Sequence, residues 1–195
     1  MPFAYLERKL VNHCASTIMG KKPACLVCFP KDDLRLKRDL DAYLKTKPDL
    51  WQDLEILILA RSHVQYVYVY RRTLLCEWLQ KAEVKSALAE FGYVYSETED
   101  WFLQLLLELR ARLQSLSAGF PHEIGLFLGY PVADVRGFIT CGGSDCLISG
   151  YWKVYADQEQ AKARFAEFNA CRDCLLRHMR TGSALWDCPL EEYTA

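Results

Sequence analysis

The side chains best suited to chemistry fall in one stretch, FPHEIGLFLGYP at residues 120–131. Pro121 fits the first position of a helix, so the sequence predicts that His122 and Glu123 lie in a first helical turn. Backbone N–H groups are unpaired there, and the helix dipole favours anions. A neutral imidazole in that setting suits acid–base catalysis or the holding of an anionic group. The simpler alternatives are a structural histidine and a first-turn acid that stabilises the helix.

His13 is a second candidate, because its spacing places it with the apolar residues of the first segment. It follows Leu10 by three residues, and Cys14 adjoins it. An inward His–Cys pair could bind a metal ion, or the imidazole could activate the thiol. The alternative is a histidine satisfied by a backbone carbonyl. The predicted catalytic residues are therefore His13, His122 and Glu123.

Basic side chains near the ends of strand-like runs could hold a ligand. Arg71 follows VYVY, and Lys153 lies inside GYWKVY. Either side chain could bind a carboxylate or a phosphate, particularly arginine with its bidentate fork. Lys153 is equally well interpreted as an edge-strand charge that blocks aggregation.

Cysteine spacing offers one further set of ligands. Cys171, Cys174 and His178 are three and four residues apart, so on a helix they share one face. A structural zinc site needs a fourth ligand in addition to these three. The alternative is that this helix face is simply buried in the hydrophobic core. Cys25 and Cys28 lie in a predicted strand, where residues three apart point to opposite faces, so we interpret them as core. The candidate metal ligands are Cys14, Cys171, Cys174 and His178.

Residues 121–140 also have the spacing of a helix-turn-helix motif. Gly125 would let two helices approach closely, and Gly129 would make the turn. The second helix, VADVRGFIT, offers only Arg136 to a nucleic acid and adds Asp134, whereas recognition helices present several polar or basic groups. A tightly packed helical corner is the favoured interpretation, and a DNA-binding module is the alternative.

Apolar periodicity predicts the scaffold that must position these residues. Helices are expected at about 3–19, 32–46, 72–80, 81–91, 99–116, 121–128, 132–140 and 157–180, and strands at about 24–29, 54–60, 64–70 and 149–156. Gly20 should end the first helix. The continuously apolar LEILILA indicates a strand covered on both faces, and the short ARSH link indicates a hairpin.

These elements predict an α/β fold, with α+β as the variant. We expect a single layered domain over residues 1–195, with a small mixed sheet of about four strands covered by helices. Residues 72–140 are expected to form a helical segment on one side of that sheet.

Composition limits the class of protein. With 51% hydrophobic and 25% charged residues the chain is globular, and a net charge of −1 gives no electrostatic footprint for nucleic acid or an anionic membrane. The start MPFAYLERKL lacks the pattern of a signal peptide, and no apolar run approaches the roughly 20 residues that span a bilayer. An odd count of nine cysteines with this start indicates a reducing compartment. We expect a cytoplasmic protein with no membrane partner.

Several segments together resemble an uncharacterised family of bacterial proteins, mostly from anaerobes. The segments are HCA at 13–15, KPA at 22–24, YRR at 70–72, FPHEIGLFLGYPVADVRGFI at 120–139 and GYWKVYAD at 150–157. The family is a domain of unknown function, so the resemblance implies no activity. It does imply a link to flavodoxin-like and iron-handling neighbours, and hence a flavodoxin-like redox partner.

The family motifs add further residues to the candidate site. They emphasise Lys22, Tyr130 and Tyr155, which join Arg71 and Lys153 as predicted ligand-binding residues. They also emphasise Pro23, Gly129, Pro131, Gly150 and Trp152.

The resulting hypothesis is a ligand-binding protein or enzyme that acts on a small anionic or metal-containing ligand. The pocket would lie between the sheet and the helical segment, lined by His13, Arg71, His122, Glu123 and Lys153. Cationic side chains would hold the anion, while a histidine or Glu123 would exchange protons or bind metal. Two alternatives stand beside it: the helix-turn-helix module and a structural or adaptor protein.

Overall fold

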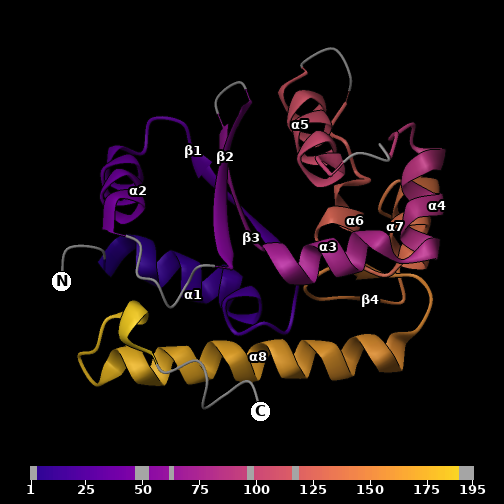
Figure 1. Cartoon of the computed structure of the whole chain (residues 1–195). Coiled ribbons are helices and arrows are strands. Elements are labelled where there is room, and N and C mark those ends of the chain that lie inside the picture. Colours follow the sequence, from indigo (N-terminus) through magenta and orange to yellow (C-terminus); the bar gives the residue numbers. More distant parts are fainter. Residues whose placement is uncertain (1–3, 47–52, 62–63, 96–98, 116–118, 189–195) are drawn as a thin grey trace.

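The computed structural model describes residues 4–46, 53–61, 64–95, 99–115 and 119–188. The elements are α1 (Ala4–Ile18), β1 (Ala24–Pro30), α2 (Leu34–Thr46), β2 (Leu54–Arg61), β3 (Val64–Arg71), α3 (Arg72–Gln80), α4 (Ala82–Glu90), α5 (Trp101–Gln114), α6 (Ile124–Phe127), α7 (Val132–Thr140), β4 (Ile148–Ser149), β5 (Lys153–Val154) and α8 (Gln158–Arg180), before a 3₁₀ turn, Leu185–Asp187. Helices and a small sheet alternate along the chain (Figure 1), which confirms the predicted α/β class.

In the described part of the chain, no helix has the length and apolar composition needed to cross a bilayer.

The main sheet contains β1, β3 and β2, with β3 in the centre. Val67 in β3 lies opposite Val27 in β1 and Ile58 in β2, and both pairings are antiparallel. The sheet is thus antiparallel where we expected a mixed one, because β2 returns directly along β3 as the predicted hairpin. The turn of that hairpin, at residues 62–63, lies outside the described residues.

The predicted fourth strand, at residues 149–156, does not join this sheet. It is instead part of a separate antiparallel hairpin of β4 and β5. The chain reverses between them, where the Gly150 N–H donates to the Trp152 carbonyl oxygen at 3.0 Å. Gly150 fits this turn because a β-carbon on it would lie 2.3 Å from the Phe165 ring of α8.

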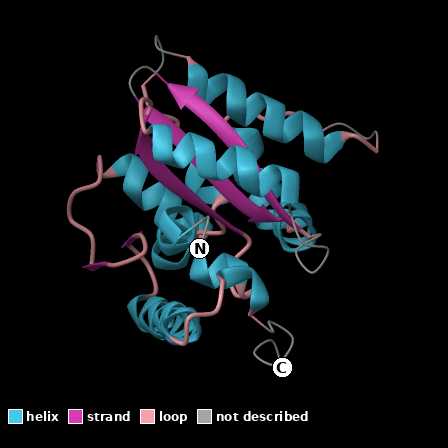
Figure 2. Ribbon diagram, turned by 90° about the vertical axis from the view of Figure 1, so that its left-hand side faces the viewer, coloured by secondary structure: helices cyan, strands magenta, loops and turns pink. Residues whose placement is uncertain are grey.

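The three-stranded sheet separates two cores, because successive side chains of a strand point to opposite faces. In β3, Val67 and Val69 enter one core, whereas Tyr68 and Tyr70 enter the other. The first core lies against α1, α2 and α8, and the second lies against α3 to α7, so helices cover both faces of the sheet (Figure 2). The apolar run of β2 also divides between the two cores, as predicted for a strand covered on both faces.

A tight corner between α6 and α7 carries much of the candidate site. Gly125 in α6 faces Val135 in α7, and a β-carbon on Gly125 would lie 2.8 Å from the Val135 Cγ2. Gly129 makes the turn between the helices with a φ of +75°, in the left-handed region that favours glycine. This is the packed helical corner that the sequence predicted.

Side chains from the second core fix the backbone of that corner. The Tyr68 hydroxyl donates to the carbonyl oxygen of Phe127 at 2.8 Å. The Trp78 Nε1–H of α3 donates to the carbonyl oxygen of Leu126 at 2.7 Å. These bonds satisfy carbonyl groups at the end of a very short helix, where intrahelical partners are lacking.

Candidate ligand pocket

A pocket of about 360 Å³ lies between the α6–α7 corner and the β4–β5 hairpin. Four aromatic rings line it, contributed by Phe120, Tyr130, Phe138 and Trp152. The polar side chains in its wall are those of His122, Asp134, Ser149 and Lys153. A concave, largely apolar site with a few polar groups has the character of a small-molecule site.

His122 lies at this pocket, but not in the helical turn predicted for it. α6 begins only at Ile124, and residues 121–123 form a turn in which the Ile124 N–H donates to the Pro121 carbonyl oxygen at 3.1 Å. The exposed imidazole packs instead between two rings, 5.0 Å from that of Phe138 and 5.5 Å from that of Phe120. Its position therefore comes from ring packing, and the predicted anion-binding helix end is absent from this corner.

Lys153 lines the pocket from β5. Its Nζ donates to the carbonyl oxygen of Gly143 at 2.5 Å, which ties β5 to the loop that follows α7. Gly143 has a φ of +78°, and a β-carbon there would lie 3.1 Å from the Phe138 ring. The ammonium group is thus held beside the pocket, next to one of its aromatic walls.

Asp134 anchors the hairpin wall to α7, a role that the sequence did not reveal. Its Oδ2 accepts from Trp152 Nε1 at 2.7 Å, and its Oδ1 accepts from the N–H groups of Tyr155 at 2.7 Å and Ala156 at 3.0 Å. The carboxylate is buried, so these three donors compensate its charge. From the sequence alone, Asp134 is only an acidic residue that weakens a recognition helix. The only feature of the sequence that links Asp134 with Trp152 is that both lie in segments that resemble the family, at 120–139 and 150–157.

Tyr130 forms the inner wall of the pocket. Its ring stacks on Trp152 with 5.1 Å between centroids, and its hydroxyl donates to the Tyr151 carbonyl oxygen at 3.1 Å. Burial raises the pKa of Tyr130 to about 12, so the phenol stays neutral. Lys22 does not line this pocket, but its Nζ lies 4.8 Å from the centroid of the Tyr130 ring.

Tyr155 contacts α7 rather than the pocket. A β-carbon on Gly137 would lie 2.5 Å from the Tyr155 side chain, so the two segments approach closely. The Tyr155 hydroxyl is buried and has no hydrogen-bond partner among the described residues. The structure therefore gives Tyr155 a packing role behind the pocket wall.

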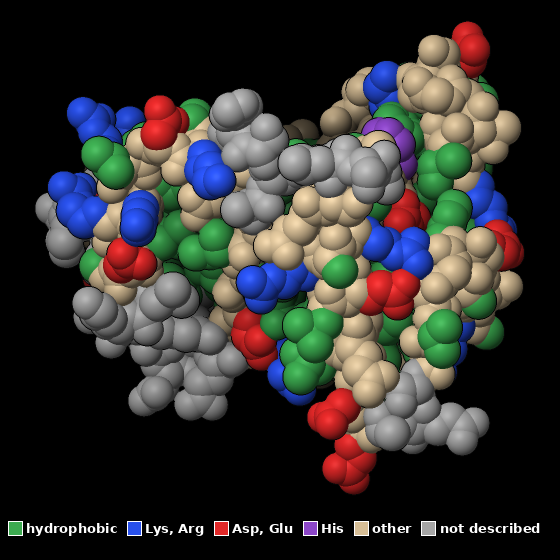
Figure 3. Space-filling view, turned by 90° about the horizontal axis from the view of Figure 1, so that it is seen from above, with side chains coloured by type: hydrophobic (Ala, Val, Ile, Leu, Met, Phe, Trp, Pro, Cys, Tyr) green, Lys and Arg blue, Asp and Glu red, His purple; other side chains and the backbone are tan. Residues whose placement is uncertain are grey.

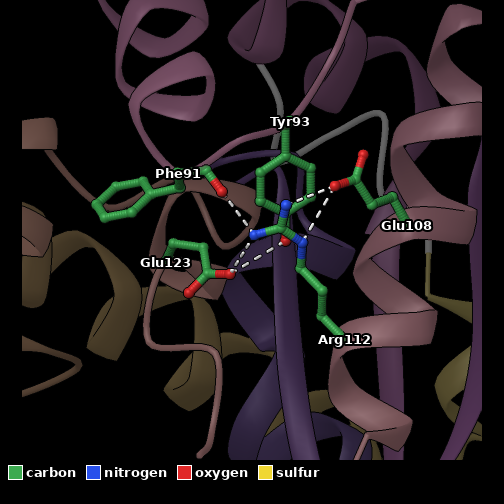
Figure 4. Close-up of polar contacts among 5 residues, drawn as sticks. All are labelled: Phe91, Tyr93, Glu108, Arg112 and Glu123. Carbon is green, nitrogen blue, oxygen red and sulfur yellow. Dashed lines mark hydrogen bonds and ion pairs between the residues drawn. The ribbon is translucent and has the colours of Figure 1, made fainter. Parts of the chain in front are cut away.

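Glu123, predicted as catalytic, belongs to an ionic cluster outside the pocket (Figure 4). Its Oε1 lies 3.2 Å from Arg112 Nη1, which also donates to the Phe91 carbonyl oxygen at 2.7 Å. Glu108 accepts from the same guanidinium at 2.5 Å, and the Tyr93 ring stacks 3.9 Å from it. Glu123 thus links α5 to the α6–α7 corner, away from the pocket that contains His122.

His13 is exposed on α1, which corrects the prediction that it points inward. The buried stripe of α1 follows Leu6, Leu10 and Cys14 at four-residue spacing, and His13 is rotated about 100° from Cys14. Cys14 itself forms a disulfide with Cys25 of β1, where we expected free thiols. His13 is absent from the pocket that contains His122.

Arg71 also lies outside the pocket, and its guanidinium is already engaged. Its Nε donates to the Thr17 carbonyl oxygen at 2.9 Å, and its Nη2 donates to that of Ile18. Its Nη1 lies 3.7 Å from the Asp53 carboxylate. Arg71 therefore caps the C-terminal end of α1, which explains its position without a ligand.

The candidate metal ligands do not form a site. The Cys14 sulfur is bonded to Cys25, and Cys171 is buried in the first core, where burial raises the pKa of its thiol. The His178 Nε2 lies 3.0 Å from the Ala184 carbonyl oxygen. Within the described ranges, no group of three His, Cys, Asp or Glu side chains could hold a metal ion. Cys25 and Cys28 point to opposite faces of β1, as predicted, but only Cys25 is buried; the exposed Cys28 corrects the interpretation of both residues as core.

The helix-turn-helix alternative depends on α7 offering positive charge. Its one basic residue, Arg136, is paired with Glu90 of α4, with Nη2 and Oε1 2.6 Å apart. Asp134 is buried on the same helix. Viewed from above, Lys and Arg side chains are interspersed with Asp and Glu over the visible face (Figure 3). The geometry therefore favours a structural corner over a nucleic-acid interface.

Comparison with known proteins supplies the family. Residues 10–187 match the family model described as a protein of unknown function (DUF3793). The chain belongs to this family. The match confirms that the chain belongs to a family of unknown function, and the DUF3793 assignment carries no activity with it. No significant match was found among curated proteins or solved structures.

Proposed function

We propose that this DUF3793 protein binds a small organic anion with a flat, apolar body in the pocket between the α6–α7 corner and the β4–β5 hairpin. One observation carries the proposal: His122 and Tyr130 from the 120–131 stretch and Lys153 from β5 line a single pocket walled by aromatic rings. Such convergence of a few polar groups on an apolar hollow is typical of ligand sites.

Each part of the wall has a role in this binding. The Phe138, Tyr130 and Trp152 rings would contact a planar ligand by offset stacking or edge contacts. The Lys153 ammonium would hold the anionic group through a charge-assisted hydrogen bond, taking the place of its bond to Gly143. His122, exposed at the pocket, would exchange a proton with the ligand if the protein is an enzyme.

Other features of the hypothesis rest on sequence alone. A metal-containing or iron-linked ligand, a flavodoxin-like redox partner and a cytoplasmic location are proposals drawn from the resemblance and from the composition. We place them second to an organic anion because the pocket wall is aromatic and cationic, with one carboxylate that is already bonded to three donors.

A fluorescent probe of matching chemistry tests the proposal. Anilinonaphthalene sulfonate has a planar aromatic body and a single sulfonate group. We expect it to bind the native chain with a stoichiometry of one. Lys153→Met and Phe138→Ala should each weaken binding by about tenfold, since each removes one of the two kinds of contact.

Two controls make this result specific to the pocket. Lys85→Met removes an exposed lysine of α4 that lies outside the pocket and should leave probe affinity unchanged. Because this probe also binds loosely packed proteins, near-ultraviolet circular dichroism must show native packing in every variant. Equal affinity in the wild type, Lys153→Met and Phe138→Ala would exclude the pocket as the binding site.

A further inference from the structure

Lys22 is a buried cation that packing within the chain does not explain. The residue is 5% exposed, and its Nζ lies over the Tyr130 ring. None of the ion pairs found within the described ranges includes it. Burial, together with the nearby Arg164, lowers the pKa of Lys22 to about 7. A buried ammonium group without a carboxylate partner destabilises the folded chain unless another anion compensates it.

Lys22 lines a second cleft, of about 190 Å³, between the Gly20–Pro23 segment, α3 and α8. Three other cationic side chains line the same cleft, those of Lys21, Lys81 and Arg164, against the single carboxylate of Glu77. The salt bridges in the described part of the chain include none of these four cations. On the face seen from above, by contrast, Lys and Arg side chains are interspersed with Asp and Glu (Figure 3).

Aromatic rings fix two of these cations. The Lys81 Nζ lies 4.9 Å from the centroid of the Trp78 ring, and the Lys22 Nζ lies 4.8 Å from that of Tyr130. Cation–π contacts orient an ammonium group without neutralising its charge. The cleft therefore holds positive charge in place while leaving it available to an anion.

We propose that this cleft binds a tetrahedral oxyanion of multiple charge, namely inorganic phosphate or the phosphoryl group of a small molecule. Lys22 would meet the anion from the base of the cleft, and the planar fork of Arg164 would bind two of its oxygens. Lys21 and Lys81 would add charge at the rim. The cleft is distinct from the aromatic pocket, so the proposal does not depend on that pocket binding a ligand.

The site also couples anion binding to proton uptake. The charged groups that line the cleft with Lys22 are Lys21 of the same segment, Glu77 of α3, Lys81 beyond α3 and Arg164 of α8, of which Arg164 acts on the Lys22 charge. A bound anion stabilises the ammonium form, so the pKa of Lys22 rises on binding. Affinity is therefore greatest below about pH 7 and falls as the pH rises above it, because the lysine must first take up a proton.

Titration of the full chain with sodium sulfate tests the site, because sulfate keeps its charge throughout the relevant pH range. Calorimetry at pH 6.5 and 8.5, at constant ionic strength, should give one site whose affinity falls about tenfold or more at the higher pH. Lys22→Met should weaken sulfate binding about tenfold or more and abolish the pH dependence. Arg164→Gln should weaken binding at both pH values while keeping that dependence.

Matched controls identify the site and the kind of anion. Lys162→Gln removes an exposed cation of α8 that pairs with Glu159, outside the cleft, and should leave sulfate affinity unchanged. At pH 8.5, where they carry the same double charge as sulfate, inorganic phosphate and glycerol phosphate should bind as sulfate does, whereas acetate should not. Acetate binding as strongly as sulfate would overturn the assignment to a tetrahedral oxyanion. Sulfate binding that is unchanged in both Lys22→Met and Arg164→Gln would overturn the site. If Lys22→Met does not fold, the sulfate affinity of Arg164→Gln and the pH dependence of sulfate binding to the wild type test the site instead.

Discussion

Gly129 lies directly against the ring of Pro23: a β-carbon on Gly129 would be 2.3 Å from the Pro23 Cγ. Lys22, which precedes Pro23, also contacts Tyr130, which follows Gly129: the Lys22 ammonium lies over the Tyr130 ring. The two sequence segments that contain KPA and LGYP therefore meet in space, and the contact joins the start of β1 to the α6–α7 corner.

This contact makes Gly129→Ala strongly destabilising. The substitution forces a non-glycine residue to a φ of +75° and drives its methyl group into Pro23, for an expected loss of about 3 kcal/mol in the free energy of unfolding. Gly142→Ala is the matched control, because its φ is +58° but the space around it is open. It should lose only about 1 kcal/mol. Urea denaturation gives both values, and equal losses would show that the Pro23 contact contributes nothing.

The Arg112 cluster should be a major source of stability for the second core. Arg112→Leu leaves the nearly buried Glu123 carboxylate without its cation. Because the guanidinium is 29% exposed, we expect a loss of about 2–3 kcal/mol rather than the full cost of a buried pair. Arg110→Leu, an exposed arginine of the same helix, should change the free energy of unfolding by less than about 0.5 kcal/mol. Similar denaturation midpoints for both variants would contradict this role.

Glu7 should make the fold less stable as the pH rises. Burial raises the pKa of its carboxyl above the ordinary value of 4.5, with Asp187 adding to the effect and a Leu185 backbone hydrogen bond opposing it. The folded state then prefers the protonated form, so stability present at low pH is lost as the pH rises from about 4.5 through the raised pKa.

Glu7→Gln checks this sign. At pH 7 the variant should be more stable than the wild type, and the difference should shrink toward pH 4. Glu167→Gln, an exposed position on α8, should leave the pH profile of the unfolding free energy unchanged. A Glu7→Gln variant that is less stable than the wild type at pH 7 would show that the ionised carboxylate has a stabilising partner.

Asp134→Asn should loosen the hairpin wall of the aromatic pocket. The amide keeps one acceptor for the Tyr155 and Ala156 N–H groups, but it offers an N–H to the Trp152 indole, which is itself a donor. We expect a loss of about 1–3 kcal/mol and faster hydrogen exchange at residues 148–156. Asp145→Asn, an exposed loop residue, serves as the control. Unchanged exchange in this hairpin would mean that packing alone holds it.

The order of elements was predictable because each depends on local pattern. The stripe of α1 and its stop at Gly20, which has a φ of +70°, follow from periodicity and glycine chemistry. The strand predicted at 149–156 is only partly correct, because a turn divides it into β4 and β5 and its aromatic residues pack on α8 rather than on the main sheet. Trp152 packs 4.6 Å from the Phe165 ring, and Tyr151 packs 5.1 Å from that of Phe168.

The candidate site was less predictable, because residue type does not reveal a partner distant in sequence. Arg71 and Glu123 have the chemistry of ligand-binding groups, yet Arg71 bonds to carbonyl groups more than fifty residues away and Glu123 to Arg112. Lys22 shows the opposite outcome. Only the family-like motif emphasises it in the sequence, and the structure places it as a buried cation outside the described ion pairs.

The alternation of valine and tyrosine along β3 has a consequence for how mutations combine. Val69 and Tyr70 are adjacent in the chain, but their side chains belong to different cores on opposite faces of the sheet. Truncations at these two positions should therefore act additively on the free energy of unfolding. Val69 and Val27, which are distant in sequence, lie in one core and should be coupled. The sheet thus separates two packed cores, and we expect truncations on its opposite faces to act independently of each other.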